Sequence, residues 1–578
     1  MKKINYTHMK QKLLSAIMLL SAVTLSTVAQ DIPALKKVGS STCLVVDGKP
    51  LVMRSGELHN STASSLEYMR ENRVMDRMAA MNLNSVIATI SWEQFEPVEG
   101  QYDYTLIDGL LQDARKNNLK LMLIWFGTWK NPMMTYAPTW VKHDPKRFPR
   151  AVDEQGNEME MLSLFSDNIT KADAKAYVAL LQHIKEVDQQ HTVVMMQIEN
   201  EPGIRGTKRD FSALAEKAWN ADVPAPLIDY LKKNKATLKP DLKQAWERNG
   251  SKTKGSWEEV FGKSLTQDDG TNPILNLTEH LFTAYSFAQH LEYLAAEGKK
   301  VYALPTFVNA SVFGIQSRGR SLGNGCSIDE FFDIYRAGAP NLDILTPNSY
   351  MTQLDQICQE YSWKGNPILI PESTVFGARA LYVVGEWDAI AFSPFGIDSA
   401  DTNPDPTAQK NCELLVESYA AIKNMEELIQ SKLGTDEMRG FLIYNGKDTA
   451  SVVMGDYKIS ITPRRGFDIG ALMAPAVGAS NTLNGAPARQ QQQQPAYQGG
   501  AIIIQTAKDE FYLVGYGFNA DFTVRDGIKT RYTGYDSIYE GRFENGKFIP
   551  GRLLNGDERN VFVGQDHVGV LKVNVYHY

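Results

Sequence analysis

Short apolar runs alternate with amphipathic stretches along most of the chain. The runs have the length and residue content of buried strands, and they are Leu51–Leu58, Ser85–Ile90, Leu119–Trp125, Val193–Glu199, Val301–Phe307, Asp343–Ser349, Pro367–Thr374 and Ile390–Gly396. The stretches between them repeat apolar residues at helical spacing, as in Ser65–Leu83, Leu106–Asn118, Lys171–Gln190, Ile328–Gly338 and Asn411–Leu433. This alternation predicts an α/β fold, a parallel (β/α)8 TIM barrel, because parallel strands need crossover connections and are buried on both faces.

The alternative to a barrel is an open, doubly wound sheet. Such a sheet should carry a glycine-rich phosphate-binding turn directly after its first strand. The chain has Ser55-Gly56-Glu57-Leu58-His59-Asn60 at this point, which lacks that glycine pattern. The sequence therefore favours the closed barrel.

A charged segment interrupts the barrel pattern after the fourth run. It extends from about residue 210 to residue 278 and has helical periodicity, as in Leu227–Leu238 and Asp241–Arg248. Loops that follow barrel strands stand at the active-site end of a barrel. We therefore expect a helical insertion that overhangs the active-site face.

The pattern changes after Gly434, where short strand-like runs recur between Asn-Gly turn signals such as Asn545-Gly546. We expect the barrel to occupy residues 30–434, and a smaller all-β, sandwich-like domain to occupy residues 435–578. The glutamine run Gln490–Gln494 separates two of the strand-like runs, and its composition predicts a disordered loop.

The first residues have the pattern of a cleavable export signal. Four lysines precede the apolar run Leu13–Leu25, and the small-residue segment Thr27-Val28-Ala29 follows it. The run is too short to span a bilayer as a permanent helix. We expect a signal peptide over residues 1–29, a periplasmic or secreted mature protein, and no stable membrane insertion after cleavage.

The net charge of the chain disfavours nucleic acid as a binding partner. Removal of the signal lowers the formal net charge from −7 to −11, since it takes away four lysines and no acidic residue. An acidic protein is poorly suited to bind nucleic acid. The charge leaves the oligomeric state open.

Cysteine and histidine spacing disfavours metal and redox chemistry. Cys43, Cys326, Cys358 and Cys412 are far apart, and no pair has metal-site or redox spacing, so we expect mostly free, buried thiols. The nine histidines form neither a His-x-His strand motif nor His-Glu-x-x-His. Dinucleotide, P-loop and nucleophile-elbow motifs are also missing from the sequence. We expect no metal and no cofactor.

Carboxylates stand at the ends of two of the expected strands. The fourth run ends in Glu199-Asn200-Glu201, and the seventh delivers Glu372. A strand that ends in an acid places a group that is costly to bury in a cleft. Strands four and seven face each other across a barrel mouth, so Glu201 and Glu372 can flank one glycosidic bond. A lone strand-terminal glutamate is explained equally well as an ion-pair partner or a helix cap.

Glu199 competes with Glu201 for the catalytic position, since the two share side-chain parity along a strand. Glu199 lies one pleat deeper in the expected strand. We therefore assign it a hydrogen-bonding role beneath the site.

Several segments together resemble glycoside hydrolase family 35. Gln197–Gly203 resembles its acid/base motif, in which an Asn-Glu pair closes the fourth strand. Ser55–His59 resembles its first-strand motif, and Trp92–Tyr104 resembles its second-strand loop. Families 35 and 42 belong to a clan of retaining barrel glycosidases with catalytic glutamates after strands four and seven. The resemblance implies that Glu201 is the acid/base and Glu372 the nucleophile of a retaining β-glycosidase.

The chain departs from the family pattern at two places. Pro202 replaces the usual aromatic residue after Asn-Glu, and Glu372 lacks a Trp-rich continuation. The third-strand loop and the trailing β domain resemble a bacterial branch often labelled β-galactosidase. We expect an exo-β-galactosidase that acts on oligosaccharides or polysaccharide side chains. Specificity for arabinosides, glucosides or mannosides stays open, as does a non-catalytic glycan-binding barrel.

The resemblance also implies a set of substrate-binding residues. Asn200 should hydrogen-bond the sugar 2-hydroxyl, and Tyr350 should contact the nucleophile or the ring oxygen. The remaining expected pocket members are Glu57, His59, Trp125, Trp129, Asn131, Asn309 and Trp387. Packing or a supporting structural role explains each of these remaining members equally well.

Overall fold

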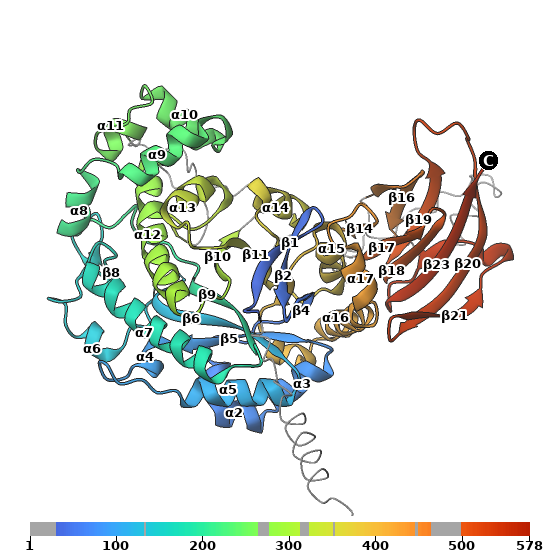
Figure 1. The fold of residues 1–578 in the computed structure, drawn as a ribbon, viewed down its shortest axis with the longest axis horizontal. Coiled ribbons are helices and arrows are strands. Elements are labelled where there is room, and N and C mark those ends of the chain that lie inside the picture. The colour runs from blue at the N-terminus through green and yellow to red at the C-terminus, as the bar shows by residue number, and fades with distance from the viewer. Residues whose placement is uncertain are drawn as a thin grey trace, which may run out of the picture.

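The computed structural model describes residues 31–131, 134–263, 277–312, 323–350, 353–444, 449–463 and 499–578. A parallel barrel ringed by helices is followed by an all-β region (Figure 1). The predicted fold class is therefore confirmed. The expected signal peptide, residues 1–29, and the glutamine run Gln490–Gln494 lie outside the described residues.

The barrel sheet contains eight strands, in the order β4-β13-β12-β11-β10-β9-β6-β5. Their bounds are β4 (Met53–Arg54), β5 (Ser85–Ser91), β6 (Lys120–Lys130), β9 (Val193–Asn200), β10 (Thr306–Val312), β11 (Ile344–Ser349), β12 (Ile370–Ser373) and β13 (Ala391–Pro394). Glu57, three residues after β4, forms parallel bridges with both Ile87 of β5 and Phe395 after β13. These bridges join the two ends of the sheet into a ring.

Apolar side chains fill the inside of the barrel. Met53, Ile87, Ile124, Met195 and Leu369, from five different strand segments, belong to one buried cluster. The cluster also contains Leu44 and Val46 of the three-stranded antiparallel sheet that precedes the barrel. The strands of that sheet are β1 (Ala34–Val38), β2 (Ser41–Val46) and β3 (Lys49–Pro50). The sheet therefore packs against the end of the barrel where the strands begin.

Helices surround the barrel strands, and small elements occupy the loops. The helices are α2 (Leu66–Glu71), α3 (Val74–Ala80), α4 (Trp92–Phe95), α5 (Thr105–Lys116), α6 (Thr139–Lys142), α7 (Asp167–Val187), α12 (Leu277–Val301), α13 (Phe332–Gly338), α14 (Leu354–Tyr361), α15 (Gly377–Trp387), α16 (Pro406–Asn424) and α17 (Glu426–Lys432). A short hairpin, β7 (Arg150–Val152) and β8 (Glu158–Leu162), precedes α7.

Several element boundaries differ from the sequence prediction, among them the following two. The single helix expected over Ser65–Leu83 is split, because Arg73 takes a left-handed conformation with φ of 50° between α2 and α3. The fifth strand begins at Thr306 rather than Val301, because α12 continues through Val301. Both corrections show that apolar runs alone do not mark where a helix ends.

The expected insertion contains four helices among its described residues. They are α8 (Ala213–Trp219), α9 (Ala225–Asn234), α10 (Pro240–Arg248) and α11 (Trp257–Phe261). They lie beside α12 and α13 in Figure 1. Tyr230 of α9 donates a 2.8 Å hydrogen bond to Asp333 of α13, and the ring of Trp257 lies 5.3 Å from that of Phe282 in α12. The insertion is thus packed on outer helices of the barrel.

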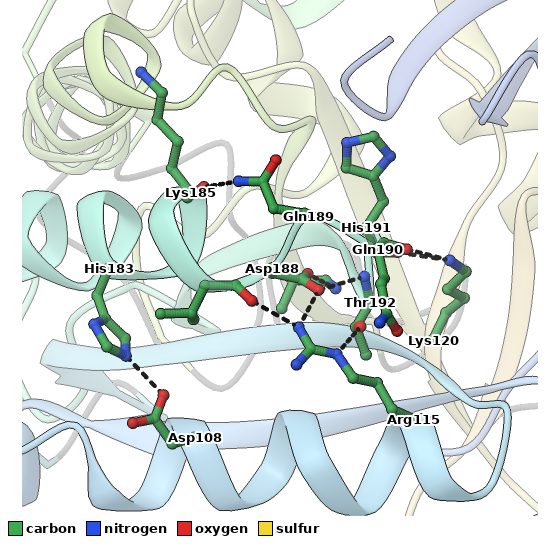
Figure 2. Close-up of polar contacts among 12 residues, drawn as sticks. Asp108, Arg115, Lys120, His183, Lys185, Asp188, Gln189, Gln190, His191 and Thr192 are labelled. Atoms are coloured by element: carbon green, nitrogen blue, oxygen red, sulfur yellow. Dashed lines mark hydrogen bonds and ion pairs between the residues drawn. The ribbon is translucent and has the colours of Figure 1, made fainter. Parts of the chain in front are cut away.

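The turn that leads from α7 into β9 is held by a buried aspartate, as Figure 2 shows. Asp188 accepts hydrogen bonds from the backbone of Thr192 at 2.9 Å and of Val193 at 2.7 Å. It also accepts a 2.7 Å hydrogen bond from the guanidinium of Arg115. The same guanidinium donates a hydrogen bond to the Thr192 hydroxyl. This network fixes where β9 begins at the base of the barrel.

The C-terminal region consists of two antiparallel sheets, in the orders β14-β17-β18-β23-β20-β21 and β15-β16-β19-β22. The strands are β14 (Met438–Ile443), β15 (Ala450–Met454), β16 (Tyr457–Pro463), β17 (Gly499–Ala507), β18 (Glu510–Tyr516), β19 (Phe518–Val524), β20 (Thr533–Glu544), β21 (Lys547–Leu553), β22 (Val561–Val563) and β23 (Gly569–His577). The rings of Tyr457 and Phe511, one from each sheet, are 5.6 Å apart. The sheets therefore pack face to face, and β14 and β17 contact barrel helix α15.

Two further expectations concern cysteines and membranes. The four cysteines are free and buried, which confirms the prediction about their thiols. Across the part of the chain that the structure describes, no helix has both the length and the apolar character needed to cross a membrane.

Candidate active site

The carboxyl end of β9 carries two glutamates in an unusual backbone conformation. Glu199 and Glu201 have φ of 61° and 48°, a left-handed conformation that non-glycine residues rarely adopt. Strand alternation is therefore lost, and the two side chains contact different surroundings. Glu199 binds the backbone of Thr128 and Trp129 together with His290 of α12, whereas Glu201 reaches the residues at the barrel mouth. The expected shared parity of Glu199 and Glu201 is therefore wrong, whereas Glu199 does have the expected hydrogen-bonding role.

Asn309 of β10 connects the two predicted catalytic glutamates. Its side-chain oxygen accepts a 2.8 Å hydrogen bond from the backbone N–H of Glu201. Its amide nitrogen donates a 2.9 Å hydrogen bond to Glu372 Oε1. The same nitrogen lies 3.0 Å from Asn200 Oδ1. Strands β9, β10 and β12 thus bring Asn200, Glu201, Asn309 and Glu372 together, all buried.

Residues of β11 and the residue that follows it contact both carboxylates. Asn348 donates a 2.6 Å hydrogen bond to Glu201 Oε1. Tyr350 donates 2.6 Å to Glu372 Oε2, so the predicted contact of Tyr350 with Glu372 is present. The hydroxyl of Ser311, in β10, also hydrogen-bonds Glu201. Both glutamates are consequently held by donors from neighbouring strands.

A buried lysine faces the glutamates from β6. Lys130 lies 3.0 Å from Asn131 Oδ1, which accepts a further 2.7 Å hydrogen bond from Asn200. Burial lowers the pKa of Lys130, while the charges of Glu372, Glu57 and Glu201 raise it, in that order of size. The lysine therefore interacts electrostatically with three carboxyl groups, and Asn131 ties it to the end of β9.

The pKa values of the two central glutamates are both displaced upward. Burial raises the pKa of Glu372 to about 7, with a further increase from the charge of Glu201, while Tyr350 and Lys130 lower it. Burial also raises the pKa of Glu201, against hydrogen bonds from Asn348 and Ser311 and the charge of Lys130. Two carboxyl groups in this situation titrate as a coupled pair, with one more easily ionised than the other.

Several buried polar atoms around these glutamates have no hydrogen-bond partner within the described residues. They are Glu57 Oε2, Gln197 Oε1 and Asn348 Oδ1. Burial, followed by the charge of Glu372, raises the pKa of Glu57 well above its usual range. Unpaired buried polar atoms cost free energy, and they gather where a polar ligand can satisfy them. The cluster is suited to a molecule rich in hydroxyl groups.

Four of the expected pocket residues are not brought to the glutamates. Trp125 is fully buried on the helix side of β6 and donates 2.6 Å to Asp173 of α7, because its side chain alternates with the inward Phe126. Trp129 packs against Phe287 of α12, with ring centroids 4.8 Å apart. Both tryptophans are therefore structural in this fold.

His59 and Trp387 also lie elsewhere. His59 is half-exposed and its ring contacts Asp398, 3.0 Å away, and Phe395 rather than a glutamate. Trp387 is the last residue of α15, which begins four residues after β12. The helix runs back toward the base for about 16 Å, so the indole of Trp387 meets Tyr382 instead of the site.

Ser311 is a site residue absent from the sequence prediction, and so are Lys130 and Asn348. Lys130 and Asn348 stand at the carboxyl end of a buried run, the same signal that singled out Glu201 and Glu372. Lys130 is the buried last residue of β6, and such a position is costly for a charge unless it serves a site. Applying the criterion to cations and amides as well as acids finds both.

A second buried cluster supports the carboxyl end of β6. Asp173, Glu199 and His290 offer possible metal-ligand atoms within 4.8 Å of one another. Their carboxylate oxygens already accept from the backbone of residues 127–129, from Thr128 Oγ1 and from Trp125. The two acids outweigh the cost of burial and raise the pKa of His290 to about 9, so the imidazolium supplies the balancing positive charge.

Gly127 allows this cluster to form. A Cβ atom at Gly127 would lie 2.6 Å from Asp173 Oδ2, which is too close for any other residue. The cluster therefore holds the backbone that presents Lys130 and Asn131, and its oxygens are already committed to that task.

A parallel barrel that carries two buried, coupled glutamates on β9 and β12 has the architecture of a barrel glycoside hydrolase. Residues 66–366, slightly more than half of the chain, match glycoside hydrolase family 42, whose description is beta-galactosidase. The chain belongs to glycoside hydrolase family 42. The comparisons give no support to family 35, so that part of the resemblance is not retained. Residues 415–564 match a domain of unknown function, DUF5597.

Solved structures with similar folds include two β-galactosidases. The one from Bacillus circulans sp. alkalophilus is 16% identical with a TM-score of 0.44, and the match covers 65% of this chain and 57% of that one. The one from the psychrophilic Marinomonas ef1 is 14% identical with a TM-score of 0.43, and the match covers 65% of this chain and 60% of that one. The catalytic domain of a Paenibacillus polymyxa β-amylase is 12% identical with a TM-score of 0.42, and the match covers 63% of this chain and 98% of that one. Similarity at this level does not discriminate between activities.

The chain spans less than two thirds of the length of either β-galactosidase structure. No curated protein sequence gives a significant match.

Proposed function

We propose that the protein is a retaining exo-β-galactosidase that removes terminal β-galactosyl residues from oligosaccharides or polysaccharide side chains. The observation that carries the proposal is the pair of buried, electrostatically coupled glutamates, Glu201 and Glu372, joined through Asn309. Membership of a family described as beta-galactosidase supports the sugar specificity.

Glu372 is the nucleophile in this proposal. Its carboxylate accepts hydrogen bonds from Asn309 and Tyr350, and Lys130 favours its ionised form. The ionised Glu372 attacks the anomeric carbon as the bond to the leaving oxygen breaks, which gives a covalent glycosyl-enzyme.

Glu201 begins the reaction protonated and gives its proton to the leaving oxygen. Once Glu372 is glycosylated, its charge is gone and the pKa of Glu201 falls, because an adjacent like charge had disfavoured ionisation. Glu201 then takes a proton from water, which attacks the anomeric carbon and releases the sugar with its configuration retained.

Neighbouring groups bind the sugar in this scheme. Asn200 contacts the 2-hydroxyl, where hydrogen bonds strengthen in the transition state. Glu57, whose Oε2 has no partner within the described residues, accepts from another hydroxyl. The carboxyl groups of Glu201 and Glu372 should stand roughly 5–5.5 Å apart, as in retaining enzymes rather than inverting ones.

Azide rescue separates the two roles. Glu201→Ala should keep the first step with aryl galactosides that have good leaving groups and lose deglycosylation, and azide should restore turnover by giving the β-azide. Glu372→Gly should be inactive, and azide should give the α-azide from the vacated side. Reversed product configurations would exchange the assigned roles. Inversion of configuration by the unmodified protein, observed by NMR, would exclude the double displacement.

A panel of aryl β-galactosides, arabinosides, glucosides and mannosides tests the sugar specificity. The galactoside should give the highest kcat/KM by a clear margin. Preference for another sugar would keep the mechanism and change the substrate, whereas no turnover of any glycoside would favour a glycan-binding barrel.

We also propose that the protein is exported. The support is the basic and apolar pattern of residues 1–29 followed by a small-residue segment. Cell fractionation and N-terminal sequencing of the mature protein should place it outside the cytoplasm, with its first residue close to Gln30.

A further inference from the structure

Three exposed tyrosines lie together at one end of the six-stranded sheet. Tyr532, Tyr576 and Tyr578 are 64%, 43% and 63% exposed. Backbone hydrogen bonds of 2.9 Å and 3.2 Å pair Tyr578 with Tyr532, while Tyr576 belongs to β23. The ring of Tyr578 lies 5.7 Å from that of Tyr532 and 5.8 Å from that of Tyr576. We call these three residues the tyrosine strip.

The position of the Tyr576 ring depends on a glycine in the neighbouring strand. Tyr576 pairs across the sheet with Gly534, and a Cβ atom at Gly534 would lie 2.5 Å from Tyr576 Cζ. The glycine thus leaves room for the tyrosine ring to lie over the backbone of β20. The planes of neighbouring rings differ by only 32° and 30°. The three rings therefore form one exposed aromatic cluster with roughly aligned planes.

Hydrogen-bonding groups continue the same face of β23. Lys572 and Asn574 alternate with buried residues and share the face of Tyr576. Asn574 donates 2.9 Å to the hydroxyl of Ser537, and Lys572 forms a 2.8 Å ion pair with Glu510. On this face of β23, the exposed tyrosine ring is therefore followed by polar side chains whose charges are paired.

This combination fits a neutral glycan. Exposed aromatic groups that cluster on a soluble protein mark interaction surfaces. A sugar ring presents an apolar C–H face and a hydroxyl edge, which match the ring face and hydroxyl tip of tyrosine, and tyrosine loses little conformational entropy on binding. The ion pair is neutral and the chain carries a net charge of −7, so an anionic polymer is disfavoured.

We propose that the tyrosine strip binds a neutral polysaccharide chain and so keeps the protein on its substrate. The choice of ligand class rests on the proposed function of the barrel. The strip lies at the start of β20 and the end of β23, whereas the opposite end of β20 leads to a hairpin whose Gly546 donates a 3.0 Å hydrogen bond to the carbonyl of Asn424 in barrel helix α16. The strip is therefore separate from Glu201 and Glu372. The strip is a second, non-catalytic carbohydrate site in the C-terminal β region.

Affinity electrophoresis of the full chain tests the proposal. Glu372→Ala protein, which cannot degrade the ligand, is run in gels that contain a soluble galactan, an arabinogalactan or a galactosylated glucan, and in polygalacturonate as the anionic comparison. At least one neutral polysaccharide should retard it. Replacing all three tyrosines by alanine should weaken the apparent affinity roughly tenfold or more, whereas the triple phenylalanine variant should keep most of it.

Tyr68→Ala is the matched control, because Tyr68 is also an exposed tyrosine, at 51%, but lies on barrel helix α2. It should leave the retardation unchanged. In the active background, the triple alanine variant should turn over a small aryl galactoside at the original rate, which also shows that it folds.

Three results would overturn the proposal. They are no retardation in any neutral gel, equal retardation of the triple alanine variant, and a change in molecular mass by light scattering upon substitution, which would indicate contact with a second copy. Retardation of a protein that turns over no glycoside would instead overturn the proposed function and leave the tyrosine strip as a glycan site.

Discussion

Buried carboxylates lie at both ends of β9, and the two ends differ in how completely their hydrogen bonds are satisfied. At the base, Asp188 accepts from two backbone N–H groups and from Arg115, and none of the residues labelled in Figure 2 keeps an unpaired buried side-chain atom. At the carboxyl end, Glu201 and Glu372 face each other, and Glu57 and Asn348 keep unpaired oxygens within the described residues.

The difference separates stability from function along one strand. The base is internally complete, which is what a folded protein needs to fix the start of a strand. At the other end, Glu199 and Glu201 have a left-handed backbone conformation, and the carboxyl groups of Glu201 and Glu372 repel each other when both are ionised. Both features cost free energy. Such costs persist where a ligand or a transition state can satisfy them, so the comparison predicts different responses to mutation.

The largest effect is expected from Glu372→Gly. Because no covalent intermediate can form, kcat with an aryl galactoside should fall on the order of 10⁴-fold or more. The protein should remain folded, since the change removes a carboxylate whose burial is unfavourable. Unfolding midpoints and single-turnover kinetics check both statements, and a loss of less than about tenfold would remove Glu372 from the chemistry.

Lys130→Met should have the next largest effect. Loss of the lysine charge should lower kcat/KM by roughly 10²–10³-fold, as for the removal of an electrostatic stabiliser. Lys130 lowers the pKa of Glu372, so its removal raises that pKa. Glu372 acts in its ionised form, and the acid limb of the kcat/KM profile should therefore move to higher pH.

Lys130→Arg serves as the control for this prediction, because it keeps the charge. Its acid limb should lie close to that of the unmodified protein even if kcat falls. A purely structural role for Lys130 would lower the amount of folded protein in both variants and leave the limb where it was.

Asp188→Ala should show the reverse behaviour at the base. Removing the Asp188 carboxylate leaves two buried backbone donors, Thr192 and Val193, without their acceptor, and the free energy of unfolding should fall by about 3 kcal/mol. Turnover per folded molecule should stay within roughly twofold, since the base does not touch the reacting atoms. Urea unfolding with active-site titration measures the two quantities separately, and a large loss of kcat in folded protein would blur the division between the two ends.

Ser311→Ala should give the smallest effect. The Ser311 hydroxyl lowers the pKa of Glu201, so its removal raises that pKa. Glu201 donates a proton in its protonated form, and the alkaline limb of the profile should move to higher pH with less than about a tenfold change in kcat. A shift to lower pH would contradict the assignment of Glu201 as the acid.

The sequence predicts the barrel and its two central glutamates because both depend on simple periodicity. Buried parallel strands are continuous apolar runs, and an acid at the end of such a run is conspicuous. Details that depend on backbone geometry are not predictable in this way. Glu199 seemed to share a face with Glu201 until left-handed φ values broke the alternation.

Side-chain direction and helix length explain the other differences. Trp125 ends an apolar run, yet the parity of β6 turns it toward α7. Trp387 follows β12 closely in sequence, but α15 carries it to the far end of the barrel. Such displacements require the register of the strand or the course of the helix, neither of which a single sequence specifies.

The central claim is that Glu372 forms a covalent bond to the sugar while Glu201 manages the proton. Incubation with an activated 2-deoxy-2-fluoro-β-galactoside slows the second step and lets the intermediate accumulate, and peptide mass spectrometry then locates the sugar. The account predicts a single fluorogalactosyl group on Glu372, with none on Glu201 or Glu57. A label on either of those residues, or turnover of the natural β-galactoside with inversion and no labelled peptide, would contradict it.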